Sequence, residues 1–329
     1  MNFQKRMLPT SKDYIFQEEG YYVWGGTMFR HQDSYYMIYS RWKQELGFLA
    51  WATDSQLCLA KTDSLHGKFE HVKVLFHYTA PETNEKICMH NPTVITWHGK
   101  IYLYYMINKG TGDWWQHRNN QRIGVAYCEN PEGEWILSSQ PVIDISPEGI
   151  DSLMVSNPTA VITKDDRILM VYKAVSKYGT LPNGGKVLCA VAQADHPSGP
   201  FIKYGNPIME NPEDRRCVED PYIWSEGGKY YALVKDFNGY FTKANHRAVA
   251  LFVSDNGIDW HCSENPLAFN PQLHYGNEII DVHYLERPQL YIENGKCVFL
   301  LCACMEHEAS DSTFNISIPL TSYKNQKSL

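Results

Sequence analysis

The stretch that decides the fold is VEDPYIWSEGGKYYALVKD, residues 218–236, in which two acids precede a proline and two apolar strands flank a polar turn. Four other stretches share this form: GGTMFRHQDSYYMIYSRW (25–42), NPTVITWHGKIYLYYMIN (91–108), NPTAVITKDDRILMVYKAV (157–175) and RPQLYIENGKCVFLLCACM (287–305). Each begins with a polar residue and a proline, or with Gly-Gly in the first case. A recurring hairpin of this kind predicts a repeat architecture.

The repeat has a nearly constant length. The equivalent positions Gly26, Pro92, Pro158, Pro221 and Pro288 are separated by 66, 66, 63 and 67 residues. A second hairpin, with Gly, Pro, Asn and Asp in its turns, follows each first one, so that each unit contains four strands. The sequence therefore predicts an all-β, five-bladed β-propeller. A solenoid or a β-sandwich fits this constant period and the lack of helical segments less well.

The predicted propeller uses the whole chain, residues 1–329, as a single domain whose blades start near residues 24, 90, 156, 219 and 286. The last unit is short by one strand. The N-terminal segment DYIFQEEGYYV, residues 13–23, is expected to complete it and to close the ring, which removes two exposed sheet edges.

Composition excludes several classes of function. The 22 Tyr and 9 Trp residues favour strands. A formal net charge of −7 argues against nucleic acid as a partner. No apolar run suits a signal peptide or a membrane span, so we expect no membrane partner and a cytoplasmic location, or secretion if a signal peptide has been removed. The nine cysteines show no CxxC spacing, and they predict neither a disulfide framework nor a metal site.

The long loops should gather on one face of the ring. They follow the second or fourth strand of a unit and include SRWKQELGFLAWATDSQ, NKGTGDWWQHRNNQ, KDFNGYFTKANHR and NPQLHYGNEIIDVHYLER. The opposite face receives only tight turns such as HGK, KDD, EGG and ENG. Functional residues concentrate on long, irregular loops, so we expect the site on the first face.

Ten residues at the starts of the innermost strands should converge near the axis of the ring. Two places before the equivalent position stand Trp24, His90, Ser156, Glu219 and Glu286. One place before it stand Gly25, Asn91, Asn157, Asp220 and Arg287. A ring of polar groups around a cleft is typical of a binding or acid–base site.

These features resemble a known group of enzymes. The five units, the x-Pro starts of the innermost strands and VEDPYI in the fourth unit are similar to the propeller glycosidases of glycoside hydrolase family 43 (arabinanases and xylosidases) and family 32 (invertases and levansucrases). In that group the fourth blade carries a Glu two places before a Pro or similar residue as general acid, and Glu219 matches it. The group's acids in blades one and three correspond to Gly25 and Asn157, so the chain resembles a divergent member.

The resemblance implies no cofactor, although some related propellers hold calcium in the central channel. Glycoside hydrolysis normally uses two carboxyl groups. Glu286 is the first candidate for the second one, with Asp151, Asp236 and Asp281 in reserve. Two structural interpretations compete: Glu286 forms an ion pair with Arg287, and Asp220 accepts backbone N–H bonds instead of raising the pKa of Glu219.

Substrate contacts are expected from both sets of five residues at the starts of the innermost strands and from one loop. The candidates are Trp24, His90, Asn91, Asn157, Asp220, Arg287, Trp114 and Lys235. Trp114 and Trp115, next to His117 and Arg118, suit stacking on a sugar or a subunit contact, and the oligomeric state stays open. The asparagines also suit a role in tying down loops. Lys173 and Lys235, at equivalent places, either bind an anionic group or neutralise ring carboxylates.

The sequence thus predicts a glycoside hydrolase, exo-acting on small oligosaccharides, with a carbohydrate as its partner molecule. Two alternatives stay open. A glycoside phosphorylase would need a basic cluster such as Arg215, Arg216, Lys235 and His246 near Glu219. A non-catalytic carbohydrate-binding propeller would bind sugars without releasing product.

Overall fold

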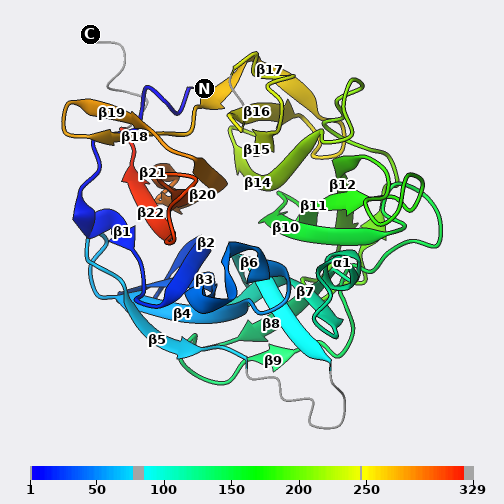
Figure 1. The fold of residues 1–329 in the computed structure, drawn as a ribbon, viewed down its shortest axis with the longest axis horizontal. Helices are drawn as coiled ribbons and strands as arrows, with labels where there is room; N and C mark the ends of the chain where they lie inside the picture. The colour runs from blue at the N-terminus through cyan, green and yellow to red at the C-terminus, as the bar shows by residue number, and fades with distance from the viewer. Residues whose placement is uncertain (1, 77–84, 245–246, 322–329) are drawn as a thin grey trace.

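The strands form five four-stranded antiparallel sheets that surround a common centre (Figure 1). The structure, a computed structural model, describes residues 2–76, 85–244 and 247–321. In every sheet the first strand of the repeat lies nearest to the centre, and the chain then runs outwards. The predicted five-bladed propeller is confirmed.

The blades follow one another along the chain. Blade 1 contains β2 (Tyr21–His31), β3 (Ser34–Lys43), β4 (Gln56–Thr62) and β5 (Glu70–Val74). Blade 2 contains β6 (Lys86–Trp97), β7 (Lys100–Gly110), β8 (Arg122–Cys128) and β9 (Ile136–Leu137). Blade 3 contains β10 (Met154–Ile162), β11 (Ile168–Val175), β12 (Val187–Ala194) and β13 (Ile202–Lys203). Blade 4 contains β14 (Val218–Glu226), β15 (Lys229–Asp236), β16 (Val249–Ser254) and β17 (His261–Phe269).

Blade 5 joins the two ends of the chain. It contains β20 (Tyr284–Glu293), β21 (Lys296–Met305), β22 (Phe314–Pro319) and the N-terminal β1 (Ile15–Phe16), which pairs with β22. The preceding residues pack between blades 4 and 5, where the buried Phe3 ring lies edge-on to Trp224 of β14 at a centroid distance of 6.0 Å. The predicted closure of the ring by the N-terminal segment is confirmed.

The core lies between neighbouring blades. Every residue of β11 and β12 is buried, because these middle strands have another blade on each face. Their sequences are accordingly almost continuous runs of Val, Ile, Leu, Ala and Met instead of alternating apolar and polar residues. The largest apolar cluster joins residues of blades 2, 3 and 4.

A β-bulge occurs at the same place in every innermost strand. The register shifts between residues 24 and 27 in blade 1, and at the equivalent positions of the other four blades. The residue at the bulge has a positive φ in all five cases: Gly25 (59°), Asn91 (56°), Asn157 (47°), Asp220 (55°) and Arg287 (56°). Because a bulge redirects a side chain, two consecutive residues of one strand can both face the axis.

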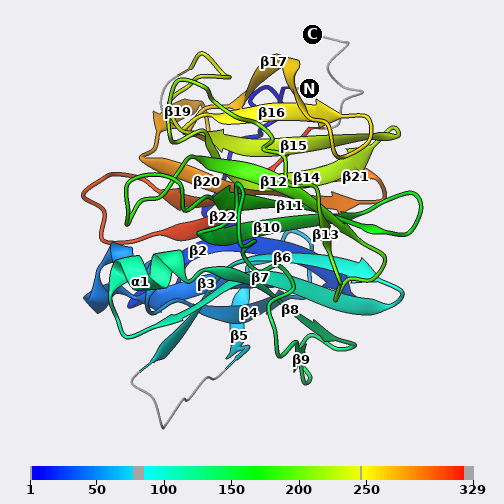
Figure 2. The same cartoon turned by 90° about the vertical axis from the view of Figure 1, so that its right-hand side faces the viewer.

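The loop face carries several short elements that the sequence analysis treated as irregular. They are η2 (Gln44–Leu46), η3 (Phe48–Ala52), α1 (Trp114–Asn119) and the hairpin of β18 (Gln272–Tyr275) and β19 (Glu278–Asp281). Figure 2 shows α1 and β19 on the same side of the ring. A further turn, η1 (Lys12–Tyr14), precedes β1. None of the helices among the described residues has the length and apolar character that a bilayer crossing requires.

Candidate active site

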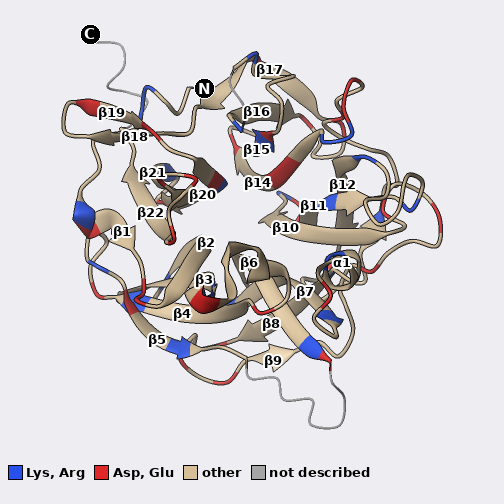
Figure 3. Ribbon diagram, viewed as in Figure 1, with Lys and Arg blue, Asp and Glu red and all other residues tan. Residues whose placement is uncertain are grey.

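A cavity of about 770 Å³ opens at the loop face, over the starts of the innermost strands. One side of it is aromatic and is formed mainly by Trp24, Trp42, Phe48, Trp51, Trp114 and Tyr284. The other side is charged and includes Lys173, Arg216, Glu219, Lys235, Arg247 and Glu286. Figure 3 shows acidic and basic positions together on β14, β15 and β20, which bear most of the charged side.

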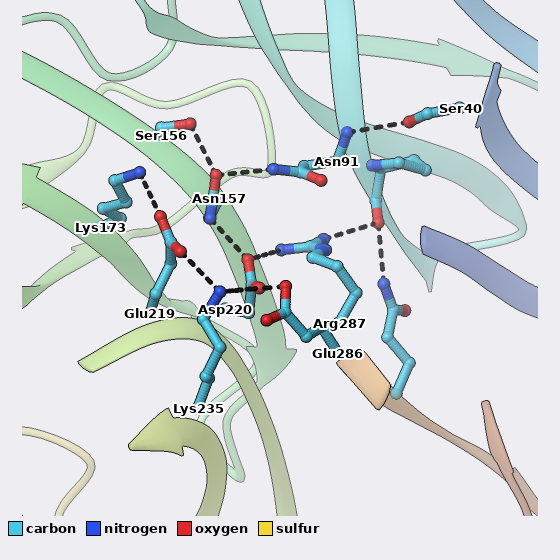
Figure 4. Close-up of polar contacts among 12 residues, drawn as sticks. Ser40, Asn91, Ser156, Asn157, Lys173, Glu219, Asp220, Lys235, Glu286 and Arg287 are labelled. Atoms are coloured by element: carbon cyan, nitrogen blue, oxygen red, sulfur yellow. Dashed lines mark hydrogen bonds and ion pairs between the residues drawn. The ribbon is translucent and has the colours of Figure 1, made fainter. Parts of the chain in front are cut away.

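Four of the five bulge residues form a buried hydrogen-bonded ring (Figure 4). Asn91 Nδ2 donates to Asn157 Oδ1 at 2.7 Å, and Asn157 Nδ2 donates to Asp220 Oδ1 at 2.6 Å. Arg287 Nη1 reaches the same oxygen of Asp220 at 3.5 Å. Gly25 completes the circle without a side chain, and a Cβ there would lie 3.4 Å from Arg287 Cγ. This is an ordinary van der Waals distance, so the positive φ of Gly25 is what favours glycine here.

Glu219 is held between two lysine ammonium groups (Figure 4). Lys173 Nζ contacts Oε1, and Lys235 Nζ lies 2.7 Å from Oε2. Burial alone would raise the pKa of Glu219, but the two adjacent cations outweigh burial and hold it well below its usual range. Glu219 is therefore a carboxylate throughout the physiological range.

Glu286 has the opposite environment. Its Oε2 lies 3.1 Å from Lys235 Nζ, and its side chain is only 9% exposed, against 18% for Glu219. Burial raises the pKa of Glu286, and the negative charges of Asp220 and Glu219 together add to this effect against the opposing charge of Lys235. Of the two glutamates, Glu286 is the one that holds a proton more readily.

Lys235 connects these carboxyl groups. It lies directly across the sheet from Glu219, and its Nζ is also 3.5 Å from Asp220 Oδ2. Because one ammonium group lies within 3.1 Å of an oxygen of both Glu219 and Glu286, these oxygens are no more than about 6 Å apart. This upper bound is compatible with the separation of about 5–5.5 Å between the two carboxyl groups of retaining glycosidases.

The aromatic side is built by rings from blades 1, 2 and 5. Trp24 packs edge-on against Phe48 at 5.4 Å and against Tyr284 at 5.9 Å between centroids. His90 lies next to Trp42 and Trp51, with its Nδ1 2.8 Å from Ser55 Oγ. Burial, then the charges of nearby Arg287 and Lys173, hold the pKa of His90 well below its usual value, so its ring is neutral.

Only one residue of the helix α1 reaches the cavity. Trp114 lines it, and its Nε1 donates to the carbonyl of Leu49 at 3.1 Å. Trp115 is 37% exposed and is not among the lining residues. His117 is buried against Asn108, and Arg118 Nη1 donates to the carbonyl of Asn183. His117 and Arg118 therefore do not line the cavity.

Three predicted carboxylates lie outside the cavity. Asp151 is buried and bonded to Lys203 Nζ at 2.7 Å and to the hydroxyl of Tyr172 at 3.1 Å, which makes it a structural contact of blade 3. Asp236 accepts the backbone N–H groups of residues 240–242 and so fixes the turn after β15. Asp281 is exposed on β19. The structure does not support Asp151, Asp236 or Asp281 as catalytic groups.

Arg287 does not line the cavity, because it is only 2% exposed and pairs with Asp220. The expected substrate contact from Arg287 is therefore wrong. The competing ion pair between Glu286 and Arg287 is wrong as well, since Glu286 pairs with Lys235. The remaining candidates Trp24, His90, Asn91, Asn157, Asp220, Trp114 and Lys235 all line the cavity.

The central ring does not suit a calcium ion. The guanidinium of Arg287 lies beside the ring carboxylate of Asp220, where a hard cation would need its ligand. Within residues 2–76, 85–244 and 247–321, no group of three or more His, Cys, Asp or Glu side chains could hold a metal ion. We therefore assign no metal to this ring.

Sequence reasoning missed much of the cavity wall. Phe48 and Trp51 lie in η3, and Arg247 and Tyr284 lie just before or at the start of strands. The signal for the first two was the apolar run FLAW within a long polar loop.

Of the proposed phosphate cluster, Arg216 and Lys235 line the cavity, Arg215 bonds to residues 183 and 185, and His246 lies outside the described residues.

Comparisons with known proteins agree with this architecture. The family model described as "Glycosyl hydrolases family 32 N-terminal domain" matches residues 159–329, slightly more than half of the chain. The comparison with curated proteins gives no match.

Many solved structures resemble the chain. One, described as a glycoside hydrolase, is 15% identical with a TM-score of 0.70, covering 96% of this chain and 92% of that chain. A GH43_1 enzyme from Xanthomonas citri complexed with xylotriose is 14% identical, with a TM-score of 0.61 and coverages of 93% and 90%. An endo-arabinase from Bacteroides thetaiotaomicron is 11% identical, with a TM-score of 0.60 and coverages of 96% and 97%. At these identities the likeness shows the fold.

Proposed function

The chain belongs to the glycosyl hydrolase family 32 N-terminal domain family and is a glycosidase, and we propose that it cleaves its carbohydrate substrate with Glu286 as proton donor and Glu219 as the ionised partner. A single observation carries this proposal. Two carboxyl groups share one ammonium group in one cavity, while their surroundings shift their pKa values in opposite directions. Such a pair separates the acid from the base.

The assignment reverses the one that the family resemblance implied, in which Glu219 is the general acid. Glu219 contacts two ammonium groups, and protonating it would leave both cations without their closest counter-charge. Glu286 contacts one ammonium group, which it shares with two other carboxylates. The lower free-energy cost of protonation is therefore at Glu286.

In the proposed reaction, Glu286 gives its proton to the glycosidic oxygen, and the leaving group departs as an alcohol. Glu286 becomes a carboxylate in this step, and Lys235 at 3.1 Å stabilises the new negative charge. Glu219 acts as a carboxylate from the other side of the reacting centre. It either attacks the anomeric carbon, giving a glycosyl-enzyme ester that water hydrolyses while Glu286 takes the proton of that water, or takes a proton from a water that attacks directly. The side chains of Trp24, Trp51 and Trp114 supply flat apolar surfaces for the C–H faces of the sugar.

Variants at the two glutamates test the roles. Glu286→Gln should lower kcat about 10²- to 10⁴-fold on glycosides with poor leaving groups and should spare activated aryl glycosides, whose departure needs no proton. Glu219→Gln should lower kcat on both kinds of substrate. Glu129→Gln, at an exposed position, is the matched control. The opposite pattern would assign the acid role to Glu219.

The site further supports exo action on small oligosaccharides. The cavity is walled by η3, by α1 and by the segments that flank the β18–β19 hairpin, through Phe48, Trp114, Pro271 and Val282. A walled cavity suits the end of a chain better than its middle. Cleavage inside an intact polysaccharide, seen as a rapid fall in viscosity, would contradict this part of the proposal.

Phosphorolysis is the second candidate function, because Arg216 and Lys235 line the same cavity as Glu219. Inorganic phosphate would then replace water and give a sugar phosphate. The test is turnover of one aryl glycoside with and without phosphate. Calorimetric binding of a sugar without any turnover would instead support the non-catalytic alternative.

A further inference from the structure

Two arginines on the charged side of the cavity have no carboxylate within ion-pair distance among the described residues. Arg216 lies just before β14, and Arg247 lies just before β16. Several other arginines of this chain have such a partner, as Arg122 has Asp144 and Arg167 has Asp195. Two unpaired guanidinium groups that line one cavity need an explanation in terms of what enters it.

The ring acids do not supply the missing negative charge. Glu219, Asp220 and Glu286 are already matched by three other cations: Lys173, Lys235 and Arg287. Arg216 and Arg247 therefore add an excess of positive charge to the cavity. The excess is local, because the chain as a whole has a net charge of −7.

Both guanidinium groups lie near aromatic rings that line the same cavity. The Arg247 Cζ lies 4.2 Å from the centroid of Tyr284, and its Nη1 lies 3.4 Å from Nε2 of His283. The Arg216 Cζ lies 5.9 Å from the centroid of Phe237. A cation–π contact restrains the position of a guanidinium group while its N–H groups stay available to a planar carboxylate.

His283 cannot act as the anion partner. Burial, and then the charge of Arg247, lower the pKa of His283, so its ring is neutral at physiological pH. It accepts a hydrogen bond from Arg247 and orients that side chain, and it leaves the positive charge uncompensated.

We propose that Arg216 and Arg247 bind the carboxylate of an acidic sugar, so that the substrate is a uronic-acid-containing glycoside. This inference rests on the proposed function. A substrate carboxylate fits better than inorganic phosphate for two reasons. Glu219 already provides an ionised group at the reacting centre, and Arg216 is exposed, whereas Lys235 is only 5% exposed. Arg216 thus lies towards the rim, where a substituent of the sugar would sit.

The experiment compares matched pairs of 4-nitrophenyl glycosides, each neutral hexoside with its hexuronide. The wild-type protein should prefer the hexuronide of a pair. Arg216→Gln and Arg247→Gln should each lower kcat/KM on that hexuronide about 10- to 100-fold and change kcat/KM on the neutral hexoside little. Arg247→Lys keeps the charge but not the paired donors, and it should recover only part of the loss.

The control is Arg30→Gln, which removes the same charge from an exposed position near the end of β2, on the opposite face. It should leave the preference unchanged, and the melting temperature of every variant should be recorded. Preference for the neutral sugar, or a hexuronide preference that survives both substitutions, would overturn the inference.

Two further outcomes distinguish a failure of this inference from a failure of the proposed function on which it rests. Turnover that requires inorganic phosphate and is lost with either arginine would assign the pair to phosphate and overturn the substrate carboxylate. If no glycoside is cleaved, the proposed function fails, and calorimetry with methyl hexuronides and methyl hexosides decides on the arginines alone. Tighter binding of the uronide by wild type than by Arg216→Gln would support them, and equal binding would overturn them.

Discussion

Blades 1 and 4 have the same backbone at the mouth of the cavity and opposite chemistry. Both innermost strands carry a β-bulge with a positive φ, at Gly25 and at Asp220, and both direct the preceding side chain into the cavity. In blade 1 that side chain is Trp24, which packs among other rings, and in blade 4 it is Glu219, which pairs with two lysines. The repeat therefore fixes where a side chain lies, while its chemistry varies freely from blade to blade.

Blade 4 thus supplies charged groups to one side of the cavity, and blade 1 supplies apolar surface for binding to the other side. Changes on the blade 4 side should alter stability and the chemical step. Changes on the blade 1 side should alter binding or local strain. The following predictions test this division, from the largest expected effect to the smallest.

Lys235→Met should have the largest effect. It removes the ammonium group shared by Glu219, Asp220 and Glu286 and leaves buried carboxylates without compensation. Loss of one partner from a buried charge cluster costs about 3–5 kcal/mol of unfolding free energy. Urea unfolding followed by circular dichroism measures it. Lys61→Met, at a more exposed pair with Glu132, is the control and should change little. An effect as small as the control's would contradict the buried cluster.

The pH dependence of kcat/KM should reflect the pKa values of the two glutamates on the charged side of the cavity. The pKa of Glu286 is raised and the proton donor must be protonated, so activity should fall tenfold for each pH unit above that pKa. The pKa of Glu219 is lowered, so protonation of Glu219 should cause no loss of activity at the pH values where a glutamate ordinarily titrates. The alkaline limb should be absent in Glu286→Gln on an activated aryl glycoside. An alkaline limb that persists in Glu286→Gln would report the titration of another group and would contradict the role of Glu286 as proton donor.

Trp114→Ala should act on binding alone. Its ring lines the cavity on the aromatic side, and loss of one stacking surface should raise KM by about tenfold while kcat stays nearly constant. Trp115→Ala, the next residue in α1, is the matched control, because Trp115 does not line the cavity. Equal changes in KM for both variants would mean that the helix is perturbed as a whole.

Gly25→Ala should have the smallest effect. Gly25 has a φ of 59°, which an alanine adopts at a cost of about 1 kcal/mol of unfolding free energy. The new Cβ would also lie 3.4 Å from Arg287 Cγ. Gly20→Ala shares the positive φ but has open space around its Cβ, so it isolates the backbone strain. A larger loss of stability for Gly25→Ala than for Gly20→Ala would reveal the contact with Arg287.

The sequence was sufficient for the fold and for the position of the ring. The x-Pro starts recur at a nearly constant spacing, and each apolar strand pair can bury its surface only against the next blade, so the architecture follows from local patterns. The hairpin in QLHYGNEIID has a Gly-Asn turn between short strands, yet it has no counterpart in the other units. The repeat therefore does not predict this hairpin.

The sequence predicted that Lys173 and Lys235 bind an anionic group or neutralise ring carboxylates, but it did not show which groups of the ring pair with one another. Arg287 is adjacent to Glu286 in the chain but bonds to Asp220 from the neighbouring blade, since the bulge turns consecutive side chains to different partners. The same limit explains why Glu219 was expected to hold a proton. Its ionisation depends on Lys173, a residue of another blade whose distance from Glu219 depends on how the two blades pack.

Difference infrared spectroscopy of the carboxyl groups tests the central claim most directly. As the pH is lowered, the account predicts that the carbonyl band of a protonated glutamic acid appears first at Glu286, so that this first band is missing in Glu286→Gln and remains in Glu219→Gln. A first band that is missing in Glu219→Gln instead would contradict the division of roles between these two residues.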